Sequence, residues 1–206
     1  EHWQSAIDGT DAIVNLAGES IAAGRWTLSR QHRIIESRVG ITTALYYALA
    51  AATHRPAVLV SASAVGYYGT HDDASFDEAS PHGDGFLARV CLEWEAAAER
   101  CRAYIPRVVR LRLGAVLAGD GGMLLRVAAP VRWFVGGALG SGAAWTSWIH
   151  IDDVVQMILW AIDRKLDGAV NVVAPHPVRQ RELVATIGRV LNRPVWLDAP
   201  ALHGAF

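Results

Sequence analysis

Short apolar runs alternate along this chain with longer stretches in which apolar residues recur at helical spacing. The short runs predict buried strands at 11–18, 56–63, 107–117 and 168–175. The periodic stretches predict helices at 28–52, with Thr27 as N-cap, and at 86–101, 123–134, 149–163 and 178–194. Strands that alternate with helices are typical of a parallel sheet with crossover helices, so the pattern predicts an α/β fold.

Polar and glycine-rich segments separate these elements. Residues 71–85 are rich in Asp, Ser, Pro and Gly and predict a surface loop. Two further loops, AGDGG (118–122) and GGALGSGAAW (136–145), lack the G-x-G-x-x-G spacing of a dinucleotide turn. We therefore expect them to be ordinary connections.

Composition narrows the function classes. The 206 residues carry a formal net charge of −1, so there is no basic field for nucleic acid, and no apolar run is long enough to cross a membrane. The chain opens without a signal-peptide pattern, which predicts a cytoplasmic protein. Cys91 and Cys101 lie ten residues apart in one predicted helix and are expected to be buried free thiols.

Two strand ends carry the candidate chemistry. SASAVGYYG (61–69) follows an apolar strand with two serines and two tyrosines. VNLAG (14–18) ends in small residues, which either let a flat ligand approach the backbone or simply form a tight turn between strand and helix. HIDD (150–153) is interpreted as a strand end followed by helix-capping carboxylates, so no metal site is predicted. The strained nucleophile elbow of α/β-hydrolases is not indicated, because G-x-S-x-G is absent.

Six segments in register resemble the extended short-chain dehydrogenase/reductase superfamily, in its NAD-dependent epimerase/dehydratase group, and most of all the atypical YfcH-like (SDR39U-type) epimerase family. They are NLAGESIAAGRWT, ESRVGIT, SASAVGYYG, GFLARVCLEWEAAA, LAGDGG and GSGAAWTSWIHIDD. The resemblance implies a Rossmann-like, doubly wound parallel sheet. It also implies that about fifty residues, with the first βαβ portion and its glycine turn, precede Glu1, and that a C-terminal segment follows.

The resemblance implies one partial NAD(P)-binding domain over residues 1–206, with substrate-side elements at about 118–150 and 175–206. NADP is the expected cofactor, with NAD as the alternative, and the substrate is an unidentified small molecule. A homodimer is allowed. The cofactor-binding positions it implies are Asn15, Leu16, Ala17, Gly18, Arg33, Arg38, Ser61, Ala62 and Val116.

The chemistry implied by the resemblance is incomplete in this sequence. The superfamily uses a Tyr as general acid/base and a Lys four residues later, whose charge lowers the tyrosine pKa. Leu87 and Cys91 stand at those positions, and Lys165 is the only lysine in the chain. Ser63 keeps the place of the carbonyl-polarising serine.

Two hypotheses follow. In the first, the protein is an oxidoreductase of the nucleoside-sugar-epimerase type with another proton donor. The candidates are Tyr67, Tyr68, Glu93 and Cys91, and Arg38 or Arg112 would replace the lysine charge. In the second, it binds NADP without catalysis, as a sensor or interaction protein. The resemblance suggests organelle division as one such role, because a plastid relative is associated with it.

Overall fold

The computed structural model describes residues 2–196 and divides into two compact units. The first contains the described residues up to Leu113 together with Gln156–Asn171. The second contains Gly114–Val155 and the described residues from Val172 onward. Each unit is described by itself.

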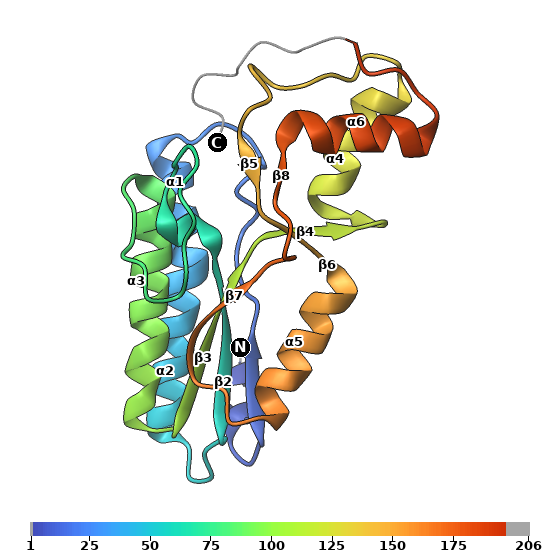
Figure 1. The fold of residues 1–206 in the computed structure, drawn as a ribbon. Helices are drawn as coiled ribbons and strands as arrows, with labels where there is room; N and C mark the ends of the chain where they lie inside the picture. Colours follow the sequence, from blue (N-terminus) through green and yellow to red (C-terminus); the bar gives the residue numbers. More distant parts are fainter. Residues whose placement is uncertain (1, 197–206) are drawn as a thin grey trace. The chain divides into compact units, whose positions relative to one another are not determined.

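A four-stranded sheet forms the centre of the first unit (Figure 1). Its order is β1 (Ala12–Asn15), β2 (Val58–Ala64), β3 (Arg107–Leu113) and β7 (Gly168–Val172). β1 pairs with β2 and β2 with β3, both in parallel. The predicted parallel α/β sheet is confirmed. The carboxyl ends of β1, β2 and β3 therefore lie at one edge, where α/β proteins bind ligands.

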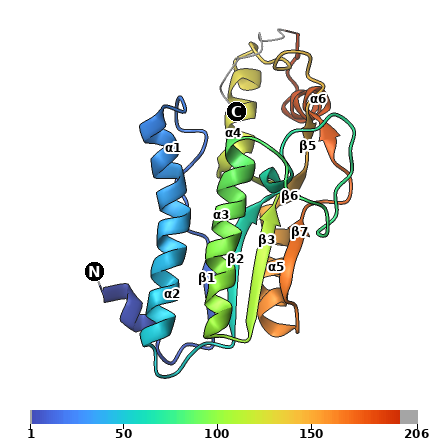
Figure 2. The ribbon, with the colours of Figure 1, turned by 90° about the vertical axis from the view of Figure 1, so that its left-hand side faces the viewer.

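Long helices cover one face of this sheet (Figure 2). The helix predicted over 28–52 consists of α1 (Leu28–Ile35), a π-helical turn (Glu36–Gly40) and α2 (Ile41–Ala51), and α3 (Phe86–Arg100) lies beside it. Their inner sides and the sheet enclose a core that includes Leu45, Leu49, Leu59, Ala98 and Val108. Both cysteines are free and buried, as predicted.

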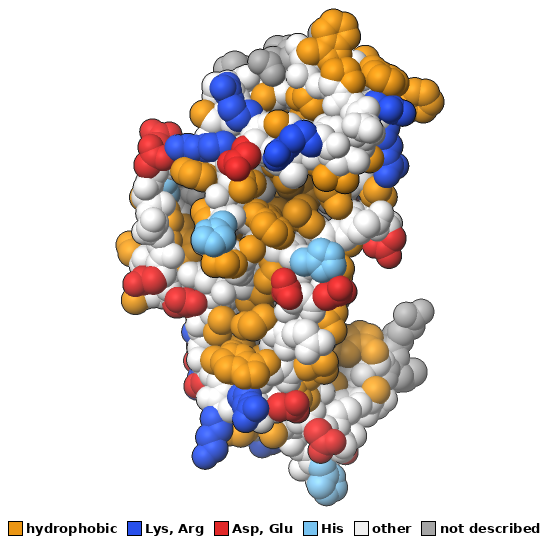
Figure 3. Space-filling model, turned by 45° about the vertical axis from the view of Figure 1, so that its right-hand side comes forward, with side chains coloured by type: hydrophobic (Ala, Val, Ile, Leu, Met, Phe, Trp, Pro, Cys, Tyr) orange, Lys and Arg blue, Asp and Glu red, His pale blue; other side chains and the backbone are white. Residues whose placement is uncertain are grey.

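Helix α5 (Ile151–Asp163) extends from the second unit into the first, where its residues lie on the opposite face of the sheet (Figure 1). Arg107 of β3 holds its C-terminal end by donating to the carbonyl oxygens of Ala161 and Ile162 at 3.1 and 2.9 Å. Val155, Leu159 and Trp160 remain exposed. Figure 3, which brings the α5 side forward, shows hydrophobic side chains on this surface.

The second unit is smaller and built from short elements. β4 (Ala115–Ala118) pairs in parallel with β6 (Trp148–His150), and β5 (Trp145–Thr146) pairs antiparallel with β8 (Val178–Arg179). Its helices are α4 (Gly122–Arg132) and α6 (Gln180–Leu191). Ala128 and Val131 of α4 pack against Val184 and Ile187 of α6.

Several predicted boundaries differ from those of the structure, and three of the differences follow from strand pairing. The strand expected over 107–117 is two strands, because Gly114 turns the chain toward β6: its amide donates to Val172 O, and the next amide donates to Ser147 O at 2.7 Å. The helices expected from 149 and 178 start at Ile151 and Gln180, because the residues before them pair as β6 and β8. Within residues 2–196, no helix is long and apolar enough to cross a membrane.

Candidate functional site

The strand ends of the first unit bring the predicted residues into neighbouring rows. Asn15 of β1 lies opposite Ser61 of β2, which lies opposite Arg110 of β3. Two residues further along, Ser63 lies opposite Arg112. Parallel pairing therefore places Ser61 between Asn15 and Arg110, and Ser63 beside Arg112.

The turn after β1 is shaped by its asparagine. The buried Asn15 donates through Nδ2 to Thr42 Oγ1 at 3.0 Å and accepts at Oδ1 from the Ala17 amide at 3.2 Å. Its side chain thus folds into the protein, while Leu16 and Gly18 are exposed. Residues 16–18 therefore form the surface of this predicted segment, and the Asn15 side chain fixes the conformation of the turn.

The predicted arginines of the next helix have different surroundings. Arg33 is largely exposed and lies 3.7 Å from a Glu19 carboxylate oxygen. Arg38 lies in the π-helical turn and donates to the carbonyl oxygens of Ile34 and Glu19 at 3.2 and 3.0 Å. Burial lowers the pKa of Arg38 from its ordinary value.

Arg38 also forms the wall behind the β1 turn. Its guanidinium lies over the ring of the buried Trp94, 5.3 Å from the centroid. A Cβ atom at Gly18 would come within 3.1 Å of the Arg38 guanidinium carbon, which is tighter than ordinary contact. A side chain at position 18 would therefore force the Arg38 guanidinium to shift by a few tenths of an ångström.

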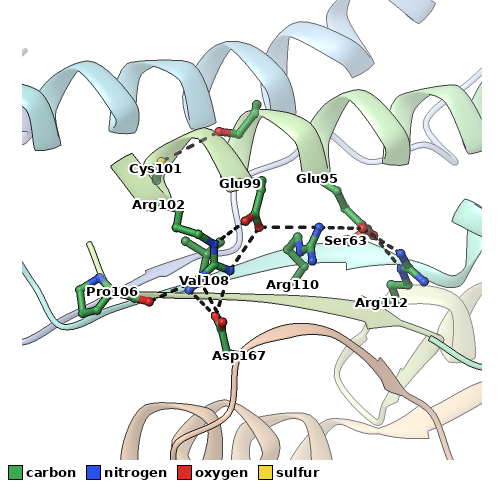
Figure 4. Close-up of polar contacts among 11 residues, drawn as sticks. Ser63, Glu95, Glu99, Cys101, Arg102, Pro106, Val108, Arg110, Arg112 and Asp167 are labelled. Atoms are coloured by element: carbon green, nitrogen blue, oxygen red, sulfur yellow. Dashed lines mark hydrogen bonds and ion pairs between the residues drawn. The ribbon is translucent and has the colours of Figure 1, made fainter. Parts of the chain in front are cut away.

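A buried polar network lies beneath the end of β2 (Figure 4). Ser63 Oγ donates to Glu95 Oε1 at 2.7 Å, and Arg112 donates to both oxygens of the same carboxylate at 2.8 and 3.0 Å. Burial alone would lower the pKa of Arg112, but its hydrogen bonds to Glu95 and Tyr68 raise it above the ordinary value. The Ser63 proton is thus directed at a carboxylate.

The two tyrosines occupy a short 3₁₀ turn, Val65–Tyr68, and differ in environment. Tyr68 is buried, and its hydroxyl donates to Asn171 Oδ1 at 2.7 Å and accepts from Arg112 at 2.9 Å. Tyr67 is half-buried, and its ring lies 3.6 Å from the Arg112 guanidinium carbon. Within residues 2–196, the Tyr67 hydroxyl has no hydrogen-bond partner.

Leu87 and Cys91 lie on the α3 side of this turn, where a Cβ atom added at Gly66 would meet Leu87 Cβ at 3.7 Å and Cys91 Sγ at 3.8 Å. Burial and then the Glu95 charge raise the pKa of Cys91 to about 11. At neutral pH the group at the expected lysine position is therefore an uncharged thiol.

The remaining predicted positions are not members of this hydrogen-bond network. Ser61 is buried and donates only to the neighbouring Ala62 carbonyl at 3.3 Å. Ala62 is buried in β2, and Val116 belongs to β4 of the second unit. Among the described residues, no group of three or more His, Cys, Asp or Glu side chains is placed to hold a metal ion.

Sequence reasoning missed Glu95 and Asn171 and considered Arg112 only as a substitute charge. The signal was present in two spacings. Arg110 and Arg112 are two residues apart on β3 and therefore share one face of the strand, and Glu95 and Glu99 are four residues apart on one face of α3. One face of β3 is thus positive and one face of α3 is negative, and the two faces pair.

The family model of the NAD-dependent epimerase/dehydratase family matches residues 1–173. The chain belongs to this family. An Arabidopsis thaliana relative named "Epimerase family protein SDR39U1 homolog, chloroplastic" is 43% identical over 201 residues, which is 96% of this chain and 57% of the relative.

Two solved structures of related proteins are similar to this chain. The human epimerase family protein SDR39U1, crystallised with NADPH, has a TM-score of 0.85 and 34% identity, over 93% of this chain and 66% of the human one. A nucleoside-diphosphate sugar epimerase from Corynebacterium glutamicum has a TM-score of 0.78 and 36% identity, over 96% of this chain and 42% of the other. The chain thus spans less than two thirds of these three relatives.

Proposed function

We propose that this chain carries the core of an NADP(H)-dependent oxidoreductase of the epimerase type, with Tyr67 as its proton donor and acceptor. The observation that carries the cofactor assignment is the family membership together with the human relative, which was solved with NADPH at 34% identity over 93% of this chain. The proton donor is argued from the contacts of the two tyrosines.

The β1 turn fits a flat nucleotide. Leu16 and Gly18 are exposed, and the guanidinium of Arg38 lies against Gly18, 3.1 Å from the position that a Cβ atom would take. We assign Leu16, Ala17, Gly18 and Arg38 to the cofactor wall, with Asn15 and Thr42 fixing the turn from beneath. When bound, the nicotinamide supplies or accepts a hydride.

Tyr67 is the best proton donor among the four candidates. Both hydrogen-bonding roles of the Tyr68 hydroxyl are taken, the Cys91 thiol is buried, and Glu93 is paired with Arg89 on the outer side of α3 at 3.9 Å. Tyr67 is half-buried, its hydroxyl has no hydrogen-bond partner among the described residues, and the Arg112 cation lies against its ring. Proton exchange needs a donor with a free hydroxyl within reach of the substrate.

The test uses the full-length protein. NADPH fluorescence titration should show binding, and a metabolite screen at 340 nm should find a carbonyl or alcohol substrate with turnover that Tyr67→Phe lowers about 100-fold. Tyr68→Phe is the matched control, because it removes a hydroxyl that is already committed inside the protein.

The outcomes separate the two hypotheses. If NADPH does not bind, the proposal fails entirely. If NADPH binds and the screen finds no turnover, the protein is a cofactor-binding sensor rather than an enzyme. If turnover survives in Tyr67→Phe but not in Tyr68→Phe, the proton donor has been assigned to the wrong tyrosine.

A further inference from the structure

Four buried polar side chains meet under the half-exposed Tyr67. Ser63, Glu95, Arg112 and Tyr68 are each at most 5% exposed. Ion pairs at this depth often contribute no net stability, because both charges lose their hydration. A buried pair that keeps fixed geometry is more readily explained by what it positions than by what it stabilises.

Glu95 leaves the Arg112 guanidinium little freedom. Two donors of Arg112, Nε and one Nη, reach the two carboxylate oxygens side by side at 2.8 and 3.0 Å. Such a two-point contact fixes the plane of the guanidinium as well as its position. Ser63 adds a third hydrogen bond to the same carboxylate.

The other side of Arg112 holds the tyrosine turn. Its second Nη donates to Tyr68 Oη at 2.9 Å and to the Glu78 carbonyl oxygen at 3.3 Å, and its carbon lies 3.6 Å from the centre of the Tyr67 ring. Arg112 therefore joins strand β3, helix α3, the loop that contains Glu78 and both tyrosines.

We propose that Arg112, clamped by Glu95, is the positioning residue of Tyr67: the fixed guanidinium holds the ring and thereby aims its hydroxyl. The assignment rests on the proposed role of Tyr67 as proton donor. It adds that the Glu95–Arg112 pair takes over the positioning of the tyrosine that the superfamily assigns to a lysine on α3. Here the positive charge comes from β3, the strand that pairs with β2 at Ser63.

The decisive variant is the double substitution Glu95→Met with Arg112→Met in the full-length protein. Either single change leaves one charge buried without its partner and is expected to lower the melting temperature. The double change replaces the pair with apolar side chains of similar length, so it should recover most of that loss. A pair with a purely structural role would then be dispensable for activity and for the reactivity of Tyr67.

Three readouts apply to wild type and double variant. In the double variant, kcat for the reduction of the aromatic 1,2-diketone 9,10-phenanthrenequinone by NADPH should fall about tenfold or more, because the Tyr67 hydroxyl is no longer held in position. The Kd for NADPH should be unchanged. Acetylation by N-acetylimidazole, followed for each tyrosine by peptide mass spectrometry, should favour Tyr67 strongly in the wild type and become similar for Tyr67 and Tyr68 in the variant.

Arg110→Lys is the matched control, since Arg110 lies 3.8 Å from the same Glu95 but contacts neither tyrosine. It should leave all three readouts at wild-type values. A folded double variant that keeps the wild-type acetylation pattern overturns the proposal, whether or not the diketone is reduced. A wild type that shows the expected pattern but binds no NADPH overturns the proposed function and supports the positioning.

Discussion

The Cys91 and Cys101 thiols have similarly raised pKa values, although their charged neighbours differ. Burial raises each thiol pKa to about 11, and the Glu95 charge adds to the effect at Cys91, whereas Arg100 opposes it at Cys101. Neither thiol is a nucleophile at neutral pH, because only the thiolate reacts.

The raised pKa values of these thiols predict that the protein loses stability in alkali. Below the ordinary thiol pKa of 9.0 both the folded and the unfolded chain hold the proton, so stability is complete there. As the pH rises from 9.0 toward about 11, the unfolded chain ionises while the folded chain does not, and the free energy of unfolding falls. Urea denaturation from pH 8 to 11 measures the slope.

The double variant Cys91→Ala, Cys101→Ala is the control for that measurement. It should show a clearly smaller fall over the same pH range, even if its stability at pH 8 is lower. An equal slope in the variant would mean that other groups cause the alkaline loss.

The single residues show where sequence reasoning stops. Resemblance and spacing located Ser63, Tyr67 and Tyr68 at the end of β2, but only the structure distinguishes the two tyrosines. The difference depends on Asn171, 103 residues away from Tyr68 in sequence. Local pattern does not carry such a contact, because it joins the turn after β2 to β7, a strand far away in the sequence.

At the scale of elements, the long first helix begins at a predicted cap. Thr27 has extended backbone, and its hydroxyl oxygen accepts from the Arg30 amide at 3.3 Å. Thr27→Ala should lower the free energy of unfolding by about 1 kcal/mol in a urea titration. Thr27→Ser keeps the oxygen and should retain most of the stability; an equal loss in both variants would exclude the cap as the cause.

The loop after β2 depends on one close approach. Gly83 donates its amide to the Tyr67 carbonyl oxygen at 2.9 Å, and a Cβ atom at 83 would lie only 2.0 Å from the Tyr68 carbonyl oxygen. Gly83→Ala should push the loop away from the tyrosine turn and cost about 1–3 kcal/mol, measured by thermal or urea denaturation.

Gly119→Ala is the comparison, because a Cβ atom there meets nothing within 4 Å. It should behave like the wild type. If both glycine variants lose the same stability, chain flexibility rather than the contact at Tyr68 explains the loss.

Elements with their own local signals were predicted well. The cap at Thr27 and the acidic first turn of α5, with Asp152 and Asp153, are both read from neighbouring residues. One of these carboxylates was expected to cap α5, but it is His150 Nδ1 that accepts from the Asp152 amide, at 3.2 Å. The break at Gly114 was missed, because residues on both sides are apolar and β-forming. What separates β3 from β4 is the partner strand, and that lies elsewhere in the sequence.

At the scale of the whole molecule, residues 1–206 contain the β1 turn but no G-x-G-x-x-G turn to hold a pyrophosphate. Made alone, they should bind NADPH more weakly than human SDR39U1, the relative solved with this cofactor. Isothermal titration of both proteins under the same conditions provides the comparison. Equal affinity would show that the wall around Gly18 and Arg38 supplies most of the binding energy.

The buried pair of Glu95 and Arg112 also restricts how this sequence can evolve. Losing Glu95 alone leaves the buried Arg112 charge without its carboxylate, and losing Arg112 alone leaves Glu95 only the longer contact with Arg110 at 3.8 Å, whereas losing both together costs less. Such a pair must therefore be replaced in two steps that pass through a poorly folded intermediate. Descendants of this protein are expected to keep both residues or neither, even where the chemistry at Tyr67 has been lost.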